Sequence, residues 1–566
     1  MDYRDESGKE YCVFHAPQQK KGISVEQFNQ HIFFRIEDAI KRQGECNLSG
    51  TVFEGDIHFR QFSEDHPFPE INFSKAIFSG WTDFSSTKFG AFTSFAYSEF
   101  KKYGVDFTYT FFSDGAKGVD FSWAQFHGDA YFKRVRFLGR ITSFNTSKFS
   151  KNAFFSESVF NLVDFVGASF QAVDFDEAIF NKSADFSYAH FMAEANFSKA
   201  TFQRVLFNER TVFDKKADFS DVAFKQIADF SQATFNYTAD FKNSNFNAEA
   251  NFGQITFNSI VDFTSASYNE GANFSGATLN GQGRFLAAFF KKEANFVRTV
   301  FRDETDFRGA MFGEGVNFEE AIFAKTGYFF GNSFPSGGDF RCIKLNEQVN
   351  FQEVHLKKLL FADTDVRKID FLNCYWPEKK GRRVFYDEIE LFSGEKDNSF
   401  ESKIKKIEIL YRRLKQKYKE EHNDPEVSNW HYGEKEMARK RKPSTRYNPI
   451  GLSNIYWLSS GYGERPVRAG IFFILLILTA SILFGLVGFA PSDDQGSGGV
   501  KLQHLTDFID NFGMLLLNTL QHVTFDKAPS FEPTSLTGKF FKIAAQILIP
   551  IQAALLALAV RNRFRR

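Results

Sequence analysis

Cysteine, proline and methionine are scarce in this chain of 566 residues, which holds four cysteines, 13 prolines and five methionines. The cysteines are scattered without a C-x-x-C pair, which excludes a dense disulfide framework and predicts reduced, buried thiols at Cys12, Cys46, Cys342 and Cys374. Net charge is also absent, since 69 Lys and Arg balance 69 Asp and Glu. Overall charge therefore indicates no class of partner.

Motifs for catalysis and cofactor binding are missing as well. The sequence contains no Walker or Rossmann glycine motif, no G-x-S-x-G and no zinc-ligand spacing. Its 11 histidines are dispersed, and the basic helical segment around His422 and His431 predicts solvated side chains. The polar, charged N-terminus does not resemble a secretory signal. We therefore predict a non-enzymatic protein without a cofactor or a metal site.

Phenylalanine, in contrast, is abundant, with 77 copies. From about Leu48 to Phe371 it recurs at alternating steps of five and six residues, interrupted by an insertion near residues 60–69. The clearest stretch reads ADFSDVAFKQI, ADFSQATFNYT, ADFKNSNFNAE. Such regular self-similarity indicates a solenoid. The expected core positions are Phe219, Phe224, Phe230, Phe235, Phe241 and Phe252.

The residues around each phenylalanine favour short extended segments over a long helix. The repeat is rich in Phe, Asp, Asn, Ser and Gly, which are mediocre helix formers. A small residue stands two positions before each aromatic, as Ala217 does before Phe219, and this alternation places both on one face. The Asp or Asn before the aromatic, and the Ser after it, are residues that bond to turn backbone.

The pattern resembles the pentapeptide-repeat family, whose pentads run A(D/N)LXX. The resemblance implies a mainly β fold, a right-handed quadrilateral β-helix with four pentads per coil. Every second pentad here carries one extra residue, which we expect to bulge at a corner. Two 11-residue units then make a coil of roughly 22 residues, and the repeat region makes about 14 coils.

The remaining segments predict helical caps and a C-terminal membrane module. We expect a helical cap over residues 1–46, with a helix from Ser24 to Arg42, the β-helix over 47–375, a helical connector over 376–446 and a membrane module over 447–566. The connector holds helices over 400–421 and 425–442. In the first helix one face is apolar, formed by Ile404, Ile407, Leu410, Tyr411 and Leu414. With its YRRLK and W-x-Y-G-E-x-E-M segments, the connector resembles the one that joins pentapeptide repeats to membrane spans in related bacterial proteins.

Two apolar runs, residues 471–489 and 540–560, are long enough to cross a bilayer, and Pro550 should kink the second. A shorter amphipathic segment, 507–525, lies between them. Arginines precede the first run and follow the second, and the loop between them is acidic. The positive-inside rule then places both termini and the β-helix in the cytoplasm, at the inner membrane.

The order of these three segments resembles the pore module of two-span potassium-type channels, although the filter sequence TVGYG is missing. The candidate pore-mouth residues are His522, Thr524 and Asp526. The other interpretation is a hairpin anchor whose middle helix lies in the interface. Before the spans, a basic run is expected to contact anionic lipid: Arg439, Lys440, Arg441, Lys442 and Arg446.

Three functions are compatible with this layout. The first is a membrane-anchored scaffold that presents the β-helix to an unidentified protein partner, with Trp81, Tyr97, Tyr103, Tyr109 and Trp123 as a contact face. The second is a homo-oligomeric pore gated by the β-helix, in the manner of a bacterial defence or growth-arrest effector. The third is a DNA mimic that inhibits a topoisomerase, but an excess of only roughly seven acidic residues over the repeat argues against it. The charge balance also argues against nucleic acid as a partner.

Overall fold

The computed structural model describes residues 3–4, 10–63, 65–113, 117–395, 397–441, 451–491, 505–524, 531–533 and 535–564. The chain divides into two compact units, Met1–Pro377 and Glu378–Arg566. Asp526, Lys442 and Arg446, which belong to the predicted pore mouth and lipid contact, lie outside the described residues.

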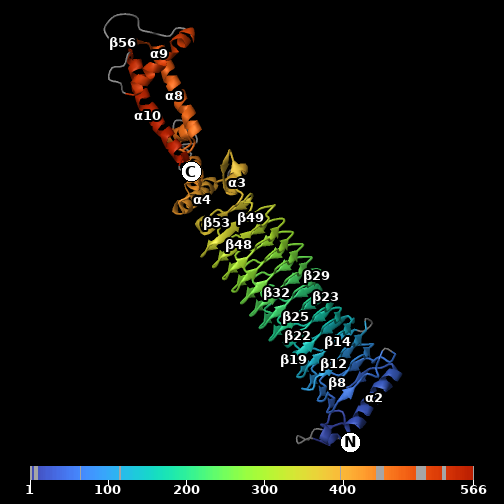
Figure 1. The fold of residues 1–566 in the computed structure, drawn as a ribbon. Coiled ribbons are helices and arrows are strands. Elements are labelled where there is room, and N and C mark those ends of the chain that lie inside the picture. The colour runs from blue at the N-terminus through green and yellow to red at the C-terminus, as the bar shows by residue number, and fades with distance from the viewer. Residues whose placement is uncertain are drawn as a thin grey trace. The chain divides into compact units, whose positions relative to one another are not determined.

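The first unit begins with helices α1 (Gln18–Lys21) and α2 (Val25–Arg42). Ser24 caps α2 through a capping box, in which its side chain accepts from the Gln27 N–H and the Gln27 side chain accepts from the Ser24 N–H. One face of α2 is buried, and its Phe28 ring lies 6.0 Å from the ring of Phe53 in the first coil. Helix α2 thus covers the N-terminal end of the solenoid (Figure 1).

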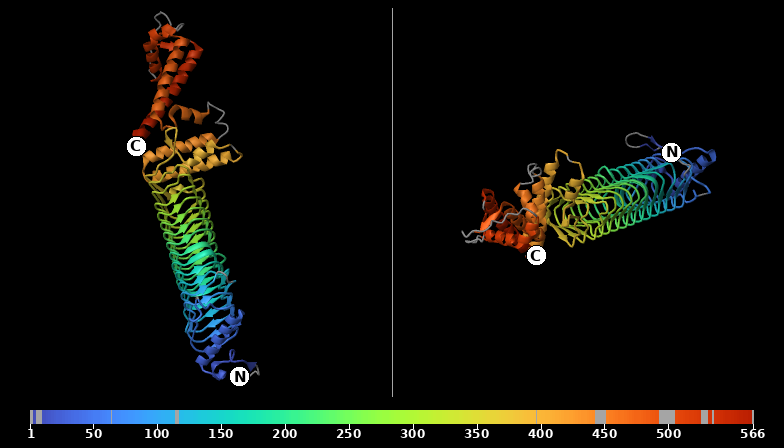
Figure 2. Two further views of the ribbon diagram at one scale, coloured as in Figure 1. Left: turned by 90° about the vertical axis from the view of Figure 1, so that its right-hand side faces the viewer. Right: turned by 90° about the horizontal axis from the view of Figure 1, so that it is seen from above.

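The rest of the unit is a β-solenoid of about 15 turns, which confirms the predicted fold. Its strands run from β3 (Cys46–Asn47) to β53 (Ile369–Leu372) and form two parallel sheets of 24 and 27 strands. Most strands have two residues. Strands β28 (Ala217–Asp218), β32 (Ala239–Asp240) and β36 (Val261–Asp262) pair in succession, each 22 residues after the last. Figure 2 shows these coils stacked along one axis.

The corners of each coil follow the predicted turn chemistry. The Asp218 carboxylate accepts from the Ser220 N–H at 3.0 Å, and Asp229 accepts from Ser231 in the same way. The residue after that serine is left-handed, with φ of 58° at Asp221 and 60° at Gln232. The corner that holds the extra residue lies at Lys225–Ile227, with a bend at Gln226. The extra residue is therefore accommodated at a corner, as expected.

Some corners are crossed by a single longer strand. Strand β22 (Ser169–Asp174) continues around a corner where the extra residue is missing, and β23 (Ile179–Asp185) continues around a corner that keeps it. The ladders that pair such strands of unequal length contain register shifts. The other longer strands are β19 (Lys148–Phe154), β26 (Thr201–Leu206), β48 (Gly327–Phe330) and β51 (Val349–Gln352). The extra residue alone therefore does not decide whether one strand or two short strands form at a corner, and corners of unequal length pair with a shift in register.

The interior is filled by columns of phenylalanine rings. The six expected core residues Phe219, Phe224, Phe230, Phe235, Phe241 and Phe252 are all at most 1% exposed. Rings in successive coils stack, with centroids 4.9 Å apart for Phe219 and Phe241, while neighbouring columns meet edge to face, at 5.4 Å for Phe230 and Phe241.

The cysteines differ in burial. Cys46 is buried as expected, but Cys12 is exposed, contrary to the prediction of a buried thiol.

The second unit opens with a hairpin, β54 (Glu378–Lys379) and β55 (Arg382–Arg383). Helices α3 (Tyr386–Ser393), α4 (Phe400–Glu420), α5 (Asp424–Arg441) and α7 (Leu452–Ser460) follow. The last elements are α8 (Pro466–Val487), β56 (Phe489–Pro491), α9 (Leu505–Val523), β57 (Phe531–Pro533) and α10 (Leu536–Phe564). Helix α10 continues on both sides of Pro550.

Helices α4 and α5 pack closely as a pair. The predicted apolar face of α4, with Ile404, Leu410 and Tyr411, is buried. A Cβ atom at Gly433 of α5 would lie 2.5 Å from the Tyr411 ring, so only glycine permits this approach. The two helices therefore form a closely packed helical pair within the second unit.

Helices α8 and α10 are the two long apolar helices of the described chain, and they lie side by side (Figure 2). Only 17% and 22% of their most apolar windows are buried inside the unit. Phe484 of α8 packs against Ala545 and Ile549 of α10. The core helix of a soluble protein would be mostly buried, so the exposed apolar surface gives weak support for membrane anchoring.

Candidate functional site

The β54–β55 hairpin brings several cations to one end of α3. Its two loop residues, Lys380 and Gly381, have φ of 51° and 69°. A two-residue loop with positive φ at both positions is the tight hairpin turn that matches strand twist. Lys379 and Arg382 consequently face each other across the ladder, directly before α3.

Glu388 of α3 is the buried anion of this region, with no exposed surface. Its carboxylate forms an ion pair with Arg382 and accepts from the Tyr411 hydroxyl at 2.7 Å. Lys379 and Lys440 lie 3.6 and 3.9 Å from its other oxygen. Burial lowers the pKa of Lys379, against the attraction of Glu388. One carboxylate thus holds three cations together.

Glu436 of α5 is a second buried carboxylate that binds several cationic and polar side chains. Its carboxylate accepts from Arg439 at 2.9 Å, from Lys440 at 3.1 Å and from the Tyr462 hydroxyl at 3.1 Å. Burial alone raises the pKa of Glu436, but Arg439 and Lys440 outweigh it, and the pKa lies below its ordinary value. The carboxylate is therefore ionised at neutral pH.

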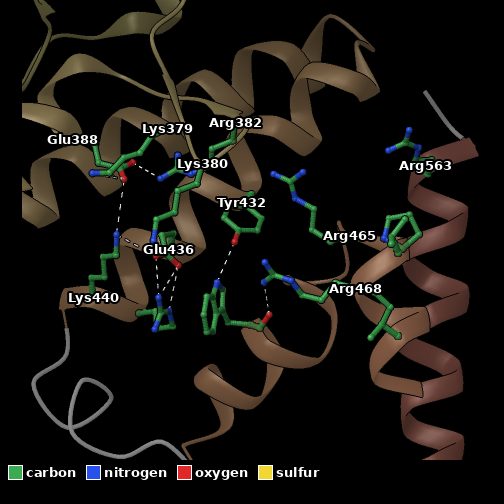
Figure 3. Close-up of a pocket in the computed structure, with 15 residues that line it drawn as sticks. Lys379, Lys380, Arg382, Glu388, Tyr432, Glu436, Lys440, Arg465, Arg468 and Arg563 are labelled. Carbon is green, nitrogen blue, oxygen red and sulfur yellow. Dashed lines mark hydrogen bonds and ion pairs between the residues drawn. The ribbon is translucent and has the colours of Figure 1, made fainter. Parts of the chain in front are cut away.

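These groups line a cavity of about 690 Å³ within the second unit, in the size range of small-molecule sites (Figure 3). Among the described residues that line it, only Glu388 and Glu436 are negatively charged. The apolar lining comes from Pro466, Val467 and Ile471 at the start of α8, beside Tyr432 and Trp457. Eight cations line it: Lys379, Lys380, Arg382, Arg439, Lys440, Arg465, Arg468 and Arg563.

Four of the eight cations form no ion pair in the described part of the chain: Lys380, Arg465, Arg468 and Arg563. Arg465 lies over the Tyr432 ring at 5.4 Å and donates to the Gly381 carbonyl at 3.5 Å. Arg468 lies over the Trp457 ring at 5.3 Å and donates to the Trp457 carbonyl at 3.2 Å. Ring stacking holds these two guanidinium groups in place while leaving their charge unneutralised.

Of the predicted lipid-contact residues, Arg439, Lys440 and Arg441 lie in the described part of the chain, and all three are already ion-paired. Arg439 and Lys440 line the cavity and bond to Glu436. Arg441 lies 3.2 Å from Glu408. The cations that lack such partners come instead from the hairpin, α8 and α10. Sequence reasoning missed Lys379, Lys380, Arg382 and Trp457, because the K-G pair in EKKGRR is not one of the usual two-residue hairpin signals.

The predicted pore-mouth residues do not share one environment. His522 of α9 is 1% exposed, and its ring lies 5.6 Å from that of Phe484. The Gln546 amide donates to the His522 carbonyl at 3.0 Å. Thr524, in contrast, is exposed, and its hydroxyl donates to the Leu520 carbonyl at 3.0 Å.

The two connector histidines also differ. His422 is exposed, as expected, but His431 is half-buried in α5. Burial, together with the charges of Lys415 and Lys435, lowers the pKa of His431 to about 4. Among the described residues, no group of three or more His, Cys, Asp or Glu side chains is arranged to hold a metal ion.

Comparison with known proteins agrees with the solenoid. Residues 165–209 and 209–256 match the family model of pentapeptide repeats (9 copies). The stacked coils define a β-solenoid protein, and the matched residues define its repeat. The chain is a pentapeptide-repeat protein with a C-terminal helical region that contains two long apolar helices.

The other two comparisons give no further support for the fold or the function. No curated protein matches the chain. A solved structure that resembles it is HetL, a pentapeptide repeat protein involved in heterocyst differentiation regulation from the cyanobacterium Nostoc sp. strain PCC 7120. The two are 12% identical, over 59% of this chain and 85% of HetL, with a TM-score of 0.09. That score is too low to support any argument from HetL.

Proposed function

We propose that this protein is a non-enzymatic, membrane-anchored scaffold that presents its solenoid to a protein partner. The observation that carries the proposal is the exposed apolar surface of α8 and α10. Leu475, Ile547 and Ile551 are 53%, 55% and 54% exposed within the unit. Two neighbouring helices with so much uncovered apolar surface need a bilayer around them.

The solenoid supports the scaffold part of the proposal. Its interior is filled by phenylalanine columns, so binding must use the outer surface. There, Tyr97 and Trp123 are about half exposed and stack on each other, with centroids 5.9 Å apart and planes at 4°. A second exposed pair lies half a coil further along the chain, at another corner, where Arg134 donates to the Tyr109 hydroxyl at 2.5 Å. Exposed, pre-stacked aromatic rings such as Tyr97 and Trp123 are typical of protein contact sites.

The arginines at the ends of the apolar helices support a topology. Arg465 and Arg468 stand at the start of α8, and Arg561 and Arg563 stand at the end of α10. By the positive-inside rule these ends face the cytoplasm of the inner membrane. Both chain termini and the solenoid are then cytoplasmic.

Membrane anchoring is tested by placing charges on the exposed apolar surface. The triple variant Leu475→Lys, Ile547→Lys, Ile551→Lys should move most of the full chain from the membrane pellet to the alkaline-carbonate supernatant. Each lysine near a helix centre disfavours insertion by about 3 kcal/mol. The control carries Ile179→Lys, Ile227→Lys and Leu286→Lys, at positions on the solenoid that are 39% to 43% exposed. Supernatant recovery of the unaltered chain would contradict the proposal.

A second candidate function is an oligomeric pore, and one observation favours it. A polar cluster lies inside the helices of the second unit, where the Ser481 and Thr519 hydroxyls are 2.9 Å apart and Asn518 and His522 are 1% exposed. Polar side chains within a membrane bundle mark ion or proton paths.

Two apolar helices per chain cannot enclose a conduit, so the pore needs several subunits. We expect the full chain in lipid nanodiscs to have the mass of a closed oligomer, about four copies by analogy with two-span channels. Native mass spectrometry measures this directly. A monomer or a dimer would eliminate the pore and leave the tethered scaffold.

A further inference from the structure

We propose that the basic cavity binds a phosphomonoester, either the headgroup of an anionic phospholipid or a soluble phosphate compound. Among the described lining residues, eight cations face two carboxylates, so six positive charges remain. A concave site with charges of one sign concentrates its field and attracts an anion. The proposal goes beyond the scaffold function, because it assigns a ligand to the second unit.

The strongest support for anion binding comes from the four lining cations that have no carboxylate partner among the described residues. Lys379, Arg382, Arg439 and Lys440 are held by Glu388 and Glu436, and serve as a rigid positive wall. Lys380, Arg465, Arg468 and Arg563 come from the hairpin loop, the start of α8 and the end of α10, and line the same cavity (Figure 3). Like charges assembled from three elements repel one another, and a bound anion removes that cost.

The chemistry of these groups selects phosphate. A phosphomonoester carries nearly two negative charges and three acceptor oxygens at neutral pH. Arginine presents a planar fork of donors that fits phosphate in a bidentate way. Stacking on Tyr432 and Trp457 fixes Arg465 and Arg468 before binding, so little side-chain entropy is lost. A single carboxylate would neutralise less of the excess charge.

The apolar part of the lining favours a lipid as the source. Pro466, Val467 and Ile471 line the cavity at the start of α8, and Val467 and Ile471 are 75% and 55% exposed. If α8 crosses the bilayer, these residues lie at headgroup depth. The cations then meet the phosphate and the apolar residues meet the glycerol end of the acyl chains.

The test uses two probes that share a phosphomonoester. The full chain is placed in phosphatidylcholine nanodiscs with a minor share of phosphatidic acid, or in pure phosphatidylcholine nanodiscs with added glycerol 3-phosphate. Bound molecules are counted by native mass spectrometry. The cavity variant is Lys380→Gln/Arg563→Gln, since both side chains are exposed and form no ion pair in the described residues. The control is Lys435→Gln/Arg561→Gln, an equal loss of charge at exposed residues of α5 and α10 that do not line the cavity.

We expect the cavity variant to bind the phosphomonoester roughly ten- to thirtyfold more weakly and the control to bind as the unaltered chain does. Selective loss with phosphatidic acid identifies the lipid as the source, and selective loss with glycerol 3-phosphate identifies a soluble ligand. An equal loss in both variants, or no binding of either probe, overturns the proposal. A chain that does not enter nanodiscs but binds glycerol 3-phosphate in buffer would contradict the anchor and support the cavity.

Discussion

Phe241→Ala lowers the local stability of the central coils by about 3–5 kcal/mol, the usual cost of truncating a buried phenylalanine. The Phe241 side chain has no exposed surface. Its ring stacks at 4.9 Å on Phe219 in one neighbouring coil and at 4.9 Å on Phe263 in the other. It also meets three rings edge to face, Phe230 at 5.4 Å, Phe252 at 5.7 Å and Phe235 at 6.2 Å. Removing it therefore breaks five ring contacts at once.

The cavity left by this substitution cannot collapse easily. The backbone beside Phe241 is fixed in the ladder, where its N–H donates to the Asp262 carbonyl at 2.7 Å and Asp240 pairs with Asp262. In a solenoid each coil contacts only its neighbours, so the defect weakens the coupling between the two halves of the stack. The expected effect is local, and greatest in the coils that contain Phe219 and Phe263.

Hydrogen exchange of the full chain measures this effect coil by coil. Amides of the coils around Phe241 should exchange roughly a hundredfold faster or more, as a loss of this size requires. The matched control is Phe330→Ala, in which the substituted ring is 41% exposed and protection should be kept. Equal protection in Phe241→Ala and the unaltered chain would contradict the idea that each ring supports its column.

The solenoid was predictable because each coil repeats the same short sequence pattern, and that pattern determines the local structure. The spacing of the phenylalanines and the alanine two residues earlier define the inward face without any distant contact, and the Asp–Phe–Ser order defines one corner. The left-handed backbone at Asp221 and Gln232 was not predicted, since these residue types differ and none is glycine. The ladder on either side imposes that conformation. The continuous strand β22 was not predicted, because a missing corner residue between Phe160 and Phe165 leaves two short strands instead.

The candidate site was predictable only in part. The basic run at Arg439–Arg441 was visible in the sequence, but the structure pairs those charges with Glu436 and Glu408. The unpaired cations are separated by up to about 180 residues, from Lys380 to Arg563, and only the packing of the helices brings them to one cavity. From the sequence, Arg465, Arg468 and Arg563 indicate only the membrane topology, because the spacing of residues along the chain does not show which charges lack a partner.

Glu388→Gln should destabilise the second unit by about 3–5 kcal/mol, because it removes one partner of a buried ion pair. Glu388 has no exposed surface and Arg382 is 9% exposed. The amide keeps the volume of the side chain and an acceptor for the Tyr411 hydroxyl. It cannot balance the charge of Arg382, nor that of Lys379 and Lys440 beside it. Thermal unfolding of the full chain in detergent, followed by tryptophan fluorescence, to which the buried Trp430 contributes, measures the loss.

Two further variants separate charge from packing. Glu420→Gln, at an exposed position of α4, should leave the unfolding temperature nearly unchanged. The double variant Glu388→Met/Arg382→Met should recover much of the stability lost in Glu388→Gln, since apolar residues of similar volume replace a buried pair at little cost. Failure of this rescue, with Glu388→Gln destabilised as expected, would mean that the hydrogen bond from Tyr411, which the amide keeps and methionine cannot accept, stabilises the unit in addition to the charge balance. A neutral Glu388→Gln would show that Arg382 reaches solvent, and that Glu388 does not organise the positive wall of the cavity.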